Sequence, residues 1–184
     1  MSVEPIVTVA DLEAMPDDNN RYEVIDGELF VSKSSGIPHQ AVSMNLTYAF
    51  LKHLEQHPVG KIYATPGVIF SDIDAVIPDL VFIRRERMNE VISGDRIVAA
   101  PDLVVEILSP GPENRRRDRI VKRQLYAKFG VKEYWILDLE TKSIEIYVLK
   151  DGSLQSWAIF GPNDTIRSTV LVGFDQPASA IFSI

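Results

Sequence analysis

Asp102–Leu108 (DLVVEIL), closed by the breaker run Ser109–Pro112 (SPGP), is the stretch that decides the fold of this 184-residue chain. Its residues are apolar on both of the faces that alternate along a strand, which is typical of a central strand covered on both sides. Glu106 interrupts that pattern, and burial of a lone carboxylate costs several kcal/mol unless a cation meets it. The stretch therefore predicts a sheet with two covered faces and an acidic group that needs a positive partner.

A second apolar run, Pro78–Phe82 (PDLVF), opens with the carboxylate of Asp79. Alternation puts Glu106 on the same face as Val104, and it puts Asp79 on the same face as Val81. If the two strands pair, Asp79 and Glu106 can converge on one divalent cation. Mg²⁺ and Mn²⁺ prefer such carboxylate oxygens together with water.

A helix predicted over about Glu113–Phe129 follows this strand. Asp118, Lys122 and Tyr126 form a stripe along it at i, i+4 and i+8, beside an apolar seam. Lys122 can therefore reach the two carboxylates while the seam packs on the sheet. A pair of carboxylates, a lysine and a metal-bound water indicate phosphodiester hydrolysis. A structural ion pair between Glu106 and Lys122 is the alternative that the residues leave open.

The rest of the chain predicts a mixed sheet of the α/β or α+β class with two main helices, in one domain over residues 1–184. The first main helix is expected over about His39–Gln56, which has the apolar periodicity of one covered face. We expect strands over eight further runs: Arg21–Ile25, Glu28–Ser32, Lys61–Ala64, Gly67–Phe70, Lys132–Leu137, Ser143–Leu149, Ser153–Phe160 and Ser168–Val172. Asp102 is expected to cap its strand or stay in solvent, and His53 and His57 are expected to face solvent.

The amino-acid composition indicates a globular domain without a membrane-spanning helix. The chain is 46% hydrophobic and 24% charged, which suits a soluble domain with a sizeable core. No window approaches the roughly 18 to 20 apolar residues of a membrane helix, and the N-terminus lacks the basic start and apolar run of a signal peptide. The absence of cysteine excludes disulfides and thiolate zinc sites. We therefore expect a cytoplasmic protein with no membrane contact.

Charge is distributed unevenly along this chain, whose net charge is −7. The predicted helix from Glu113 to Lys128 carries seven basic and two acidic residues, so a polyanion can dock there on an otherwise acidic protein. The residues predicted to grip phosphates are Arg115, Arg116, Arg117 and Arg119, with a solvated helix face as the alternative. His39, at the start of the first helix, is predicted to assist a phosphate or a water, or else to be a capping or surface histidine.

Taken together, these motifs resemble a known family. Pro78-Asp79 followed by Glu106-Ile107-Leu108 is similar to the PD-(D/E)xK nuclease signature, with Leu108 at the position of the motif lysine. The sequence around these motifs, over about Leu12–Leu149, resembles the Uma-type restriction endonucleases, long catalogued as a domain of unknown function. The stretches that carry this resemblance are Tyr22–Leu29, Pro78–Phe82, Pro101–Pro110, Asp118 with Lys122 and Tyr126, and Gly130–Ile136.

The resemblance implies a restriction-endonuclease-like fold, metal-dependent cleavage of DNA, and a homodimer. It also implies that Lys122, on the following helix, takes the place of the missing motif lysine. Glu23 is implied to line the site, where it binds a second ion or positions the first. In this hypothesis Asp79, Glu106 and the backbone carbonyl of Ile107 hold Mg²⁺ or Mn²⁺. The alternative function is a catalytically inactive nuclease fold that serves as a nucleic-acid-binding or assembly module, and cleavage of RNA cannot be separated from cleavage of DNA by sequence.

Overall fold

A six-stranded mixed sheet forms the centre of the computed structural model, which describes residues 6–183. Its strand order is β12-β11-β10-β9-β6-β3. The strands are β3 (Gly60–Ala64), β6 (Leu80–Arg84), β9 (Leu103–Ile107), β10 (Glu133–Asp138), β11 (Ser143–Lys150) and β12 (Ser153–Phe160). Every residue of β9 is buried. The apolar run around Glu106 therefore forms the central strand that its pattern predicts.

The pairing of β9 with β6 brings the two predicted carboxylates together. The strands are antiparallel, and Leu80 pairs with Val105 while Val81 pairs with Val104. Asp79 comes one residue before β6, so this register leads it to the neighbourhood of Glu106. On its other side β9 pairs with β10 in the parallel sense, which requires a crossover connection.

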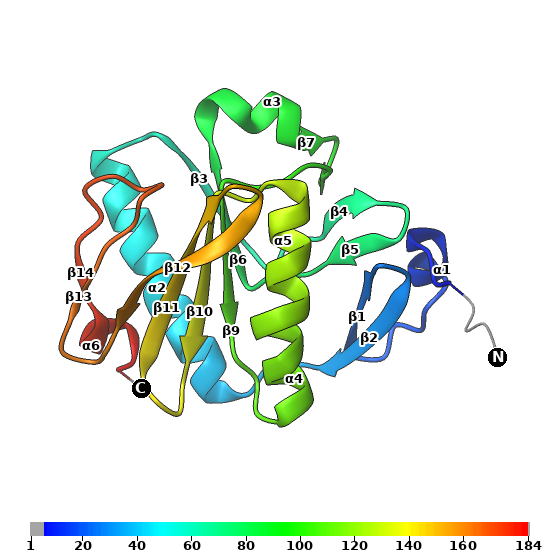
Figure 1. Cartoon of the computed structure of the whole chain (residues 1–184), viewed down its shortest axis with the longest axis horizontal. Helices are drawn as coiled ribbons and strands as arrows, with labels where there is room; N and C mark the ends of the chain where they lie inside the picture. The colour runs from blue at the N-terminus through cyan, green and yellow to red at the C-terminus, as the bar shows by residue number, and fades with distance from the viewer. Residues whose placement is uncertain (1–5, 184) are drawn as a thin grey trace.

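Helices cover both faces of the central sheet (Figure 1). The helix α2 (Ile37–Gln56) buries Val42, Leu46 and Phe50 against one face. The opposite face is covered by one continuous helical stretch made of α4 (Pro112–Arg116), the π-helical turn η2 (Arg117–Lys122) and α5 (Arg123–Phe129). Leu125 and Tyr126 of α5 belong to the apolar cluster on that side. This mixed α/β arrangement confirms the predicted fold class.

A second, more irregular sheet, in the order β2-β1-β5-β4-β8-β7, lies beside the first. Its strands are β1 (Asn20–Ile25), β2 (Glu28–Lys33), β4 (Val68–Ser71), β5 (Asp74–Val76), β7 (Ile92–Ser93) and β8 (Arg96–Ile97). Asp26 and Gly27 have φ angles of 48° and 78°, as a two-residue turn between twisted strands needs. The hairpin that the Asp-Gly pair predicts is confirmed, and it positions Glu23 beside the central sheet.

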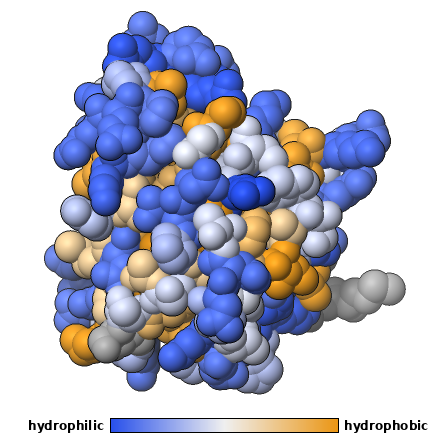
Figure 2. Space-filling model, turned by 90° about the vertical axis from the view of Figure 1, so that its left-hand side faces the viewer, coloured by the Kyte–Doolittle hydropathy of each residue, from blue (hydrophilic) through white to orange (hydrophobic). Residues whose placement is uncertain are grey.

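Short elements complete the fold. They are α1 (Val9–Glu13), the 3₁₀ turn η1 (Arg85–Arg87), α3 (Met88–Val91), β13 (Thr165–Ile166), β14 (Gln176–Pro177) and α6 (Ala178–Ile181). Figure 2 shows the side of the molecule that carries β13, β14 and α6, where hydrophilic residues predominate and apolar residues are scattered among them. Between residues 6 and 183, no helix is both long and apolar enough to cross a membrane.

The strand predicted over Ser168–Val172 is wrong. Glu133, which is fully buried, accepts hydrogen bonds from the Thr169 N–H at 2.6 Å, from the Val170 N–H at 3.2 Å and from the Ser168 hydroxyl at 2.6 Å. A carboxylate remote in sequence therefore satisfies the main-chain donors that a strand would have paired with a neighbouring strand. The segment forms a loop around that carboxylate instead.

Candidate active site

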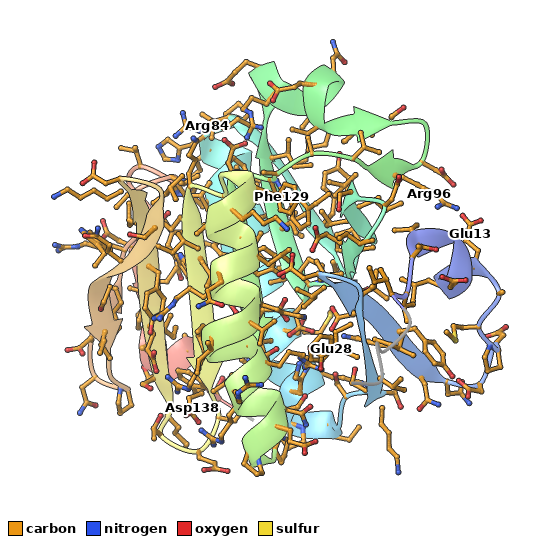
Figure 3. The ribbon with its side chains drawn as sticks, turned by 45° about the vertical axis from the view of Figure 1, so that its right-hand side comes forward. Glu13, Glu28, Arg84, Arg96, Phe129 and Asp138 are labelled. Carbon is orange, nitrogen blue, oxygen red and sulfur yellow. The ribbon has the colours of Figure 1, made fainter. Side chains whose placement is uncertain are left out.

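Four of the predicted site residues converge on one cleft. They line a cavity of about 20 Å³, which suffices for an ion or a water molecule. Glu23 comes from β1, Asp79 from just before β6, Glu106 from β9 and Lys122 from η2. The four residues are only 2–4% exposed. In Figure 3, Glu28 of the β1–β2 hairpin lies on one side of the covering helix and Asp138 of β10 lies on the other.

Lys122 is the cation that Glu106 requires. Its Nζ lies 2.9 Å from Glu106 Oε1 and 2.8 Å from Glu23 Oε1. Asp118 Oδ1 is also within 4.0 Å of this Nζ. Burial lowers the pKa of Lys122, but the carboxylates of Glu106, Glu23 and Asp118 outweigh it and raise the pKa above its ordinary value. Lys122 is therefore a permanently charged group held between carboxylates.

The π-helical turn is the local feature that carries Lys122. This widened turn, Arg117–Lys122, interrupts an otherwise α-helical stretch at the place where the helix lines the cleft. Such turns are rare and are frequent at functional sites. Asp118 and Lys122 are both buried here, whereas Ile120 between them is 43% exposed. The local sequence carries no signal for this distortion, which periodicity alone treats as regular helix.

Tyr126 is a site residue to which the sequence assigned no role. Its hydroxyl donates to Glu106 Oε1 at 2.6 Å, on the same oxygen that accepts from Lys122. The i, i+4, i+8 stripe with Asp118 was the available signal. Because Tyr126 is buried in the core, its hydroxyl holds Glu106 in one orientation.

Asp79 is the second carboxylate of the cleft, and its surroundings keep it charged. Its Oδ2 accepts from the Ile107 N–H at 2.8 Å and lies 3.1 Å from His39 Nε2. Arg21 NH1 is 3.4 Å from Oδ1. Burial alone would raise the pKa of Asp79, but the hydrogen bond and charge of His39, the Ile107 N–H and Lys122 together lower it. The predicted helix-start histidine thus contacts the site directly, as a partner of Asp79.

Glu106 behaves in the opposite way. Burial raises the pKa of Glu106 to about 8, because the charge of Lys122 opposes the shift only in part and the carboxylates of Asp118, Asp79 and Glu23 add to it. Without metal, the protonated form of this carboxyl group is therefore favoured more than in an ordinary glutamate. Because several carboxylates lie close together around Glu106, additional positive charge in the cleft would be stabilising.

The residues present fit a hard divalent cation bound through few protein ligands. Among residues 6–183, no group of three or more histidine, aspartate or glutamate side chains is placed to hold a metal ion by itself. Asp79 and Glu106 offer carboxylate oxygens, and the hydrogen bond from the Ile107 N–H brings its main chain into the same cavity. Mg²⁺ commonly binds through one or two carboxylates and retains several waters. The donor set is therefore suited to Mg²⁺ or Mn²⁺ completed by water and substrate.

The predicted phosphate-gripping arginines fall into two groups. Arg115 lies 2.8 Å and Arg119 lies 3.2 Å from Asp138 Oδ2. Arg117 is buried, with its Nε 2.9 Å from Asp118 Oδ1 and its NH1 3.9 Å from Glu23. Arg116 is exposed. Three of these four arginines are thus paired with carboxylates within the fold, and Arg116 is the exposed one.

Outside the cleft, the expectation that Asp102 caps a strand is met, and the expectation that His53 faces solvent is wrong. Asp102 is 2% exposed; it accepts from the Arg84 N–H at 2.9 Å and lies 3.0 Å from Arg87 NH1, so it caps the neighbouring chain but does not stay in solvent. His53 is 7% exposed and stacks on His57 with ring centroids 4.6 Å apart. It lies on the inner face of α2 because it follows Leu46 by two helical turns. His57 is exposed, as expected.

Comparisons with known proteins agree with this fold. The sequence model of the Uma2 family, described as "Putative restriction endonuclease", matches residues 9–179. Among solved structures, the chain is similar to one described as "a putative nuclease belonging to DUF820" from Anabaena variabilis ATCC 29413. That similarity has a TM-score of 0.77 at 16% identity and covers 96% of this chain and 97% of that one, which shows a shared fold. No curated protein matches the sequence.

Proposed function

The chain belongs to the Uma2 family, and from this membership we propose that it is a metal-dependent endonuclease that hydrolyses phosphodiester bonds of DNA. The observation that carries the proposal is the position of Lys122 Nζ, within 2.9 Å of both Glu106 and Glu23, in the cavity that Asp79 also lines. This arrangement offers carboxylate oxygens for a cation and a fixed positive charge for a phosphate.

Asp79, Glu106 and the carbonyl of Ile107 would hold Mg²⁺ or Mn²⁺, with Glu23 available for a second ion. Such an ion supplies Lewis acidity and a bound water of lowered pKa. His39 and the Ile107 N–H orient Asp79, since both contact its Oδ2. Tyr126 orients Glu106 in the same way. These hydrogen bonds limit the rotamers of both carboxylates before substrate arrives.

Lys122 has the chemical role in the proposal. A buried ammonium group with a raised pKa cannot act as a general base at neutral pH. It instead places positive charge where negative charge grows on the scissile phosphate and keeps the attacking water in position. Glu23 also holds the Lys122 ammonium group, at 2.8 Å. The lysine supplied by the helix thus takes over from the motif position that Leu108 occupies.

DNA would approach the cleft past Arg21 and Lys33, which line the cavity and are less buried than Arg117. Arg116, exposed on α4, adds a phosphate contact next to it. Arg115 and Arg119 are paired with Asp138 and are therefore less available to DNA. We also propose, in line with the family resemblance, that the enzyme acts as a homodimer in the cytoplasm.

An inactive nuclease fold that binds nucleic acid or assembles with partners is the second candidate. The observation in its favour is burial, because the carboxylates of the cleft are already paired with Lys122, Arg117 or His39. Such a module has no need of a metal ion. Calorimetric titration with Mg²⁺ and Mn²⁺ separates the two candidates.

Plasmid nicking tests the proposed function directly. We expect purified protein to nick supercoiled DNA in Mg²⁺ or Mn²⁺ and to stop in EDTA. Asp79→Asn should abolish nicking, whereas Asp72→Asn, a matched change at an exposed aspartate, should leave it unchanged. Intact plasmid under all metal conditions, together with the absence of metal binding, would refute the enzyme and favour the inactive module. Equal nicking by both variants would identify a contaminating nuclease.

A further inference from the structure

The long helix α2 is apolar on two opposite faces. Its inner face packs on the central sheet, with Leu46 and Phe50 fully buried. Its outer face exposes Ile37 at 73%, Met44 at 69%, Tyr48 at 67% and Leu51 at 49%. A helix that is apolar all round normally has both faces covered. No described element covers the outer face of α2.

These four exposed residues, together with the partly buried Ala41 and the exposed Glu55, follow a coiled-coil pattern. Steps of four and three residues alternate along Ile37, Ala41, Met44, Tyr48, Leu51 and Glu55. These are the a and d positions of a heptad, which place every member on one seam of the helix. The seam lies opposite the residues that α2 buries, and at 1.5 Å per residue it is roughly 28 Å long. Single exposed apolar residues are common, but a continuous seam of this length marks an interface.

We propose that a second copy of this chain covers the seam, with the two α2 helices packed antiparallel about a two-fold axis. In antiparallel pairs an a position faces a d position. Ala41 then opposes Leu51 of the partner subunit, and Met44 opposes Tyr48 of the partner subunit. Each layer joins a smaller side chain to a larger one, so the seam complements itself.

Charge also favours the antiparallel arrangement. The N-terminus of α2 has no side-chain cap and no acidic residue in its first turn. In the proposed register, the partner subunit's Glu55 lies beside Ile37, where its carboxylate meets the positive end of the helix dipole. Lys33, exposed just before the helix, adds a second positive charge there. A parallel pair would instead place Glu55 against its own copy and Ala41 against Ala41, which brings like charges together and leaves a gap.

Sedimentation velocity without DNA or metal gives the first test, so its result does not depend on nuclease activity. Wild type should sediment as a dimer, and the double variant Met44→Glu with Tyr48→Glu should sediment as a folded monomer. Val172→Glu, at a residue that is 77% exposed elsewhere on the surface, should remain dimeric. Circular dichroism establishes that each variant is folded. A monomeric wild type, or a seam variant that is folded and still dimeric, would overturn the proposal.

Disulfide trapping tests the register, and the absence of cysteine from the chain makes it clean. The double variant Ala41→Cys with Leu51→Cys should form an interchain cross-link on mild oxidation, because these positions face each other across the seam. Each single variant is the matched control, since like positions lie about 15 Å apart along the axis in this register. Cross-linking by the Ala41→Cys single variant would indicate a parallel pair. A dimer that the double variant fails to cross-link would place the interface on another surface; either result refutes the proposal.

Discussion

Replacement of Glu106 by glutamine is the perturbation that best separates a metal site from a structural ion pair. Without metal, burial and the carboxylates of Asp118, Asp79 and Glu23 raise the pKa of Glu106 from 4.5 to about 8. Between these values the folded protein holds a proton that the unfolded chain has lost. Each pH unit in this window lowers the free energy of unfolding by about 1.4 kcal/mol. The whole window therefore amounts to roughly 5 kcal/mol at most.

The direction follows from the raised pKa. The contribution of Glu106 to stability is complete below about pH 4.5 and is lost as the pH rises toward about 8. Glutamine resembles the protonated side chain, carries no charge, and still accepts from Tyr126 and Lys122. Lys122 also keeps Glu23 at 2.8 Å, so it is not left without a partner. The metal-free variant should thus melt at or above the wild-type temperature at pH 7, and its advantage should grow up to about pH 8.

Thermal melts in EDTA from pH 5 to pH 9 provide the assay. In a domain of this size, 1 kcal/mol corresponds to about 2–4 °C in Tm. Wild type should therefore lose about 3–6 °C per pH unit relative to the variant at most. The other titrating groups are shared by both proteins, so the difference isolates Glu106. Parallel curves, or a variant destabilised by about 3 kcal/mol or more at pH 7, would identify a structural ion pair and refute the reasoning.

Addition of metal completes this test. Mg²⁺ at about 100 times its Kd should stabilise wild type by about 2.7 kcal/mol, because it binds the folded state alone. The glutamine variant should gain little, since it has lost one carboxylate ligand. Mg²⁺ also competes with the proton on Glu106, so the stabilisation of wild type should increase with pH. Equal stabilisation of both proteins would show that Glu106 is not a ligand of the metal.

Four further outcomes are expected. Lys122→Ala should slow nicking by about 100-fold or more while calorimetry still detects Mg²⁺, because its charge acts in the transition state; a wild-type rate would exclude it from catalysis. Tyr126→Phe should reduce activity or metal affinity by about 10-fold, as loss of a group that orients a ligand does, and unchanged values for both would remove its positioning role. Arg116→Ala should reduce the salt slope of DNA binding by about one unit, whereas an unchanged slope would move the DNA path off α4. Glu133→Ala should lower the Tm sharply, since buried donors of the Ser168–Val172 loop lose their acceptor; a shift of less than 2 °C would show that the loop does not depend on it.

Local pattern was sufficient for much of the fold because periodicity reports which faces are covered. The run around Glu106 became β9, the Asp26-Gly27 pair became a turn, and α2 begins two residues before its predicted start at His39. The same logic located the acidic pair, because a carboxylate in an apolar strand is anomalous without a partner. Helical spacing also brought Lys122 to the site, and it put Tyr126 on the same stripe without revealing its role. These inferences required only neighbours in sequence.

Pattern failed where the deciding contact came from a distant part of the chain. The Ser168–Val172 run is rich in residue types that favour strands, yet its main-chain N–H groups donate to the Glu133 carboxylate. In α2 the predicted apolar face is the buried one, but His53 shares that face and was expected in solvent because its side chain is polar. The π-helical turn at Arg117–Lys122 has no local signature at all.

The sequence by itself determined that Glu106 needs a cation, that Asp79 and Lys122 are its candidate companions, and that the chain folds around a central strand. Only the tertiary structure decided how the charges are shared. It set Lys122 between Glu106 and Glu23, gave Asp79 the His39 contact, and withdrew Arg117 into the core. The physical reason is that charge interactions in a poorly solvated cleft depend on distances of a few ångströms between elements remote in sequence. Such distances exist only after the sheet and its covering helix have packed.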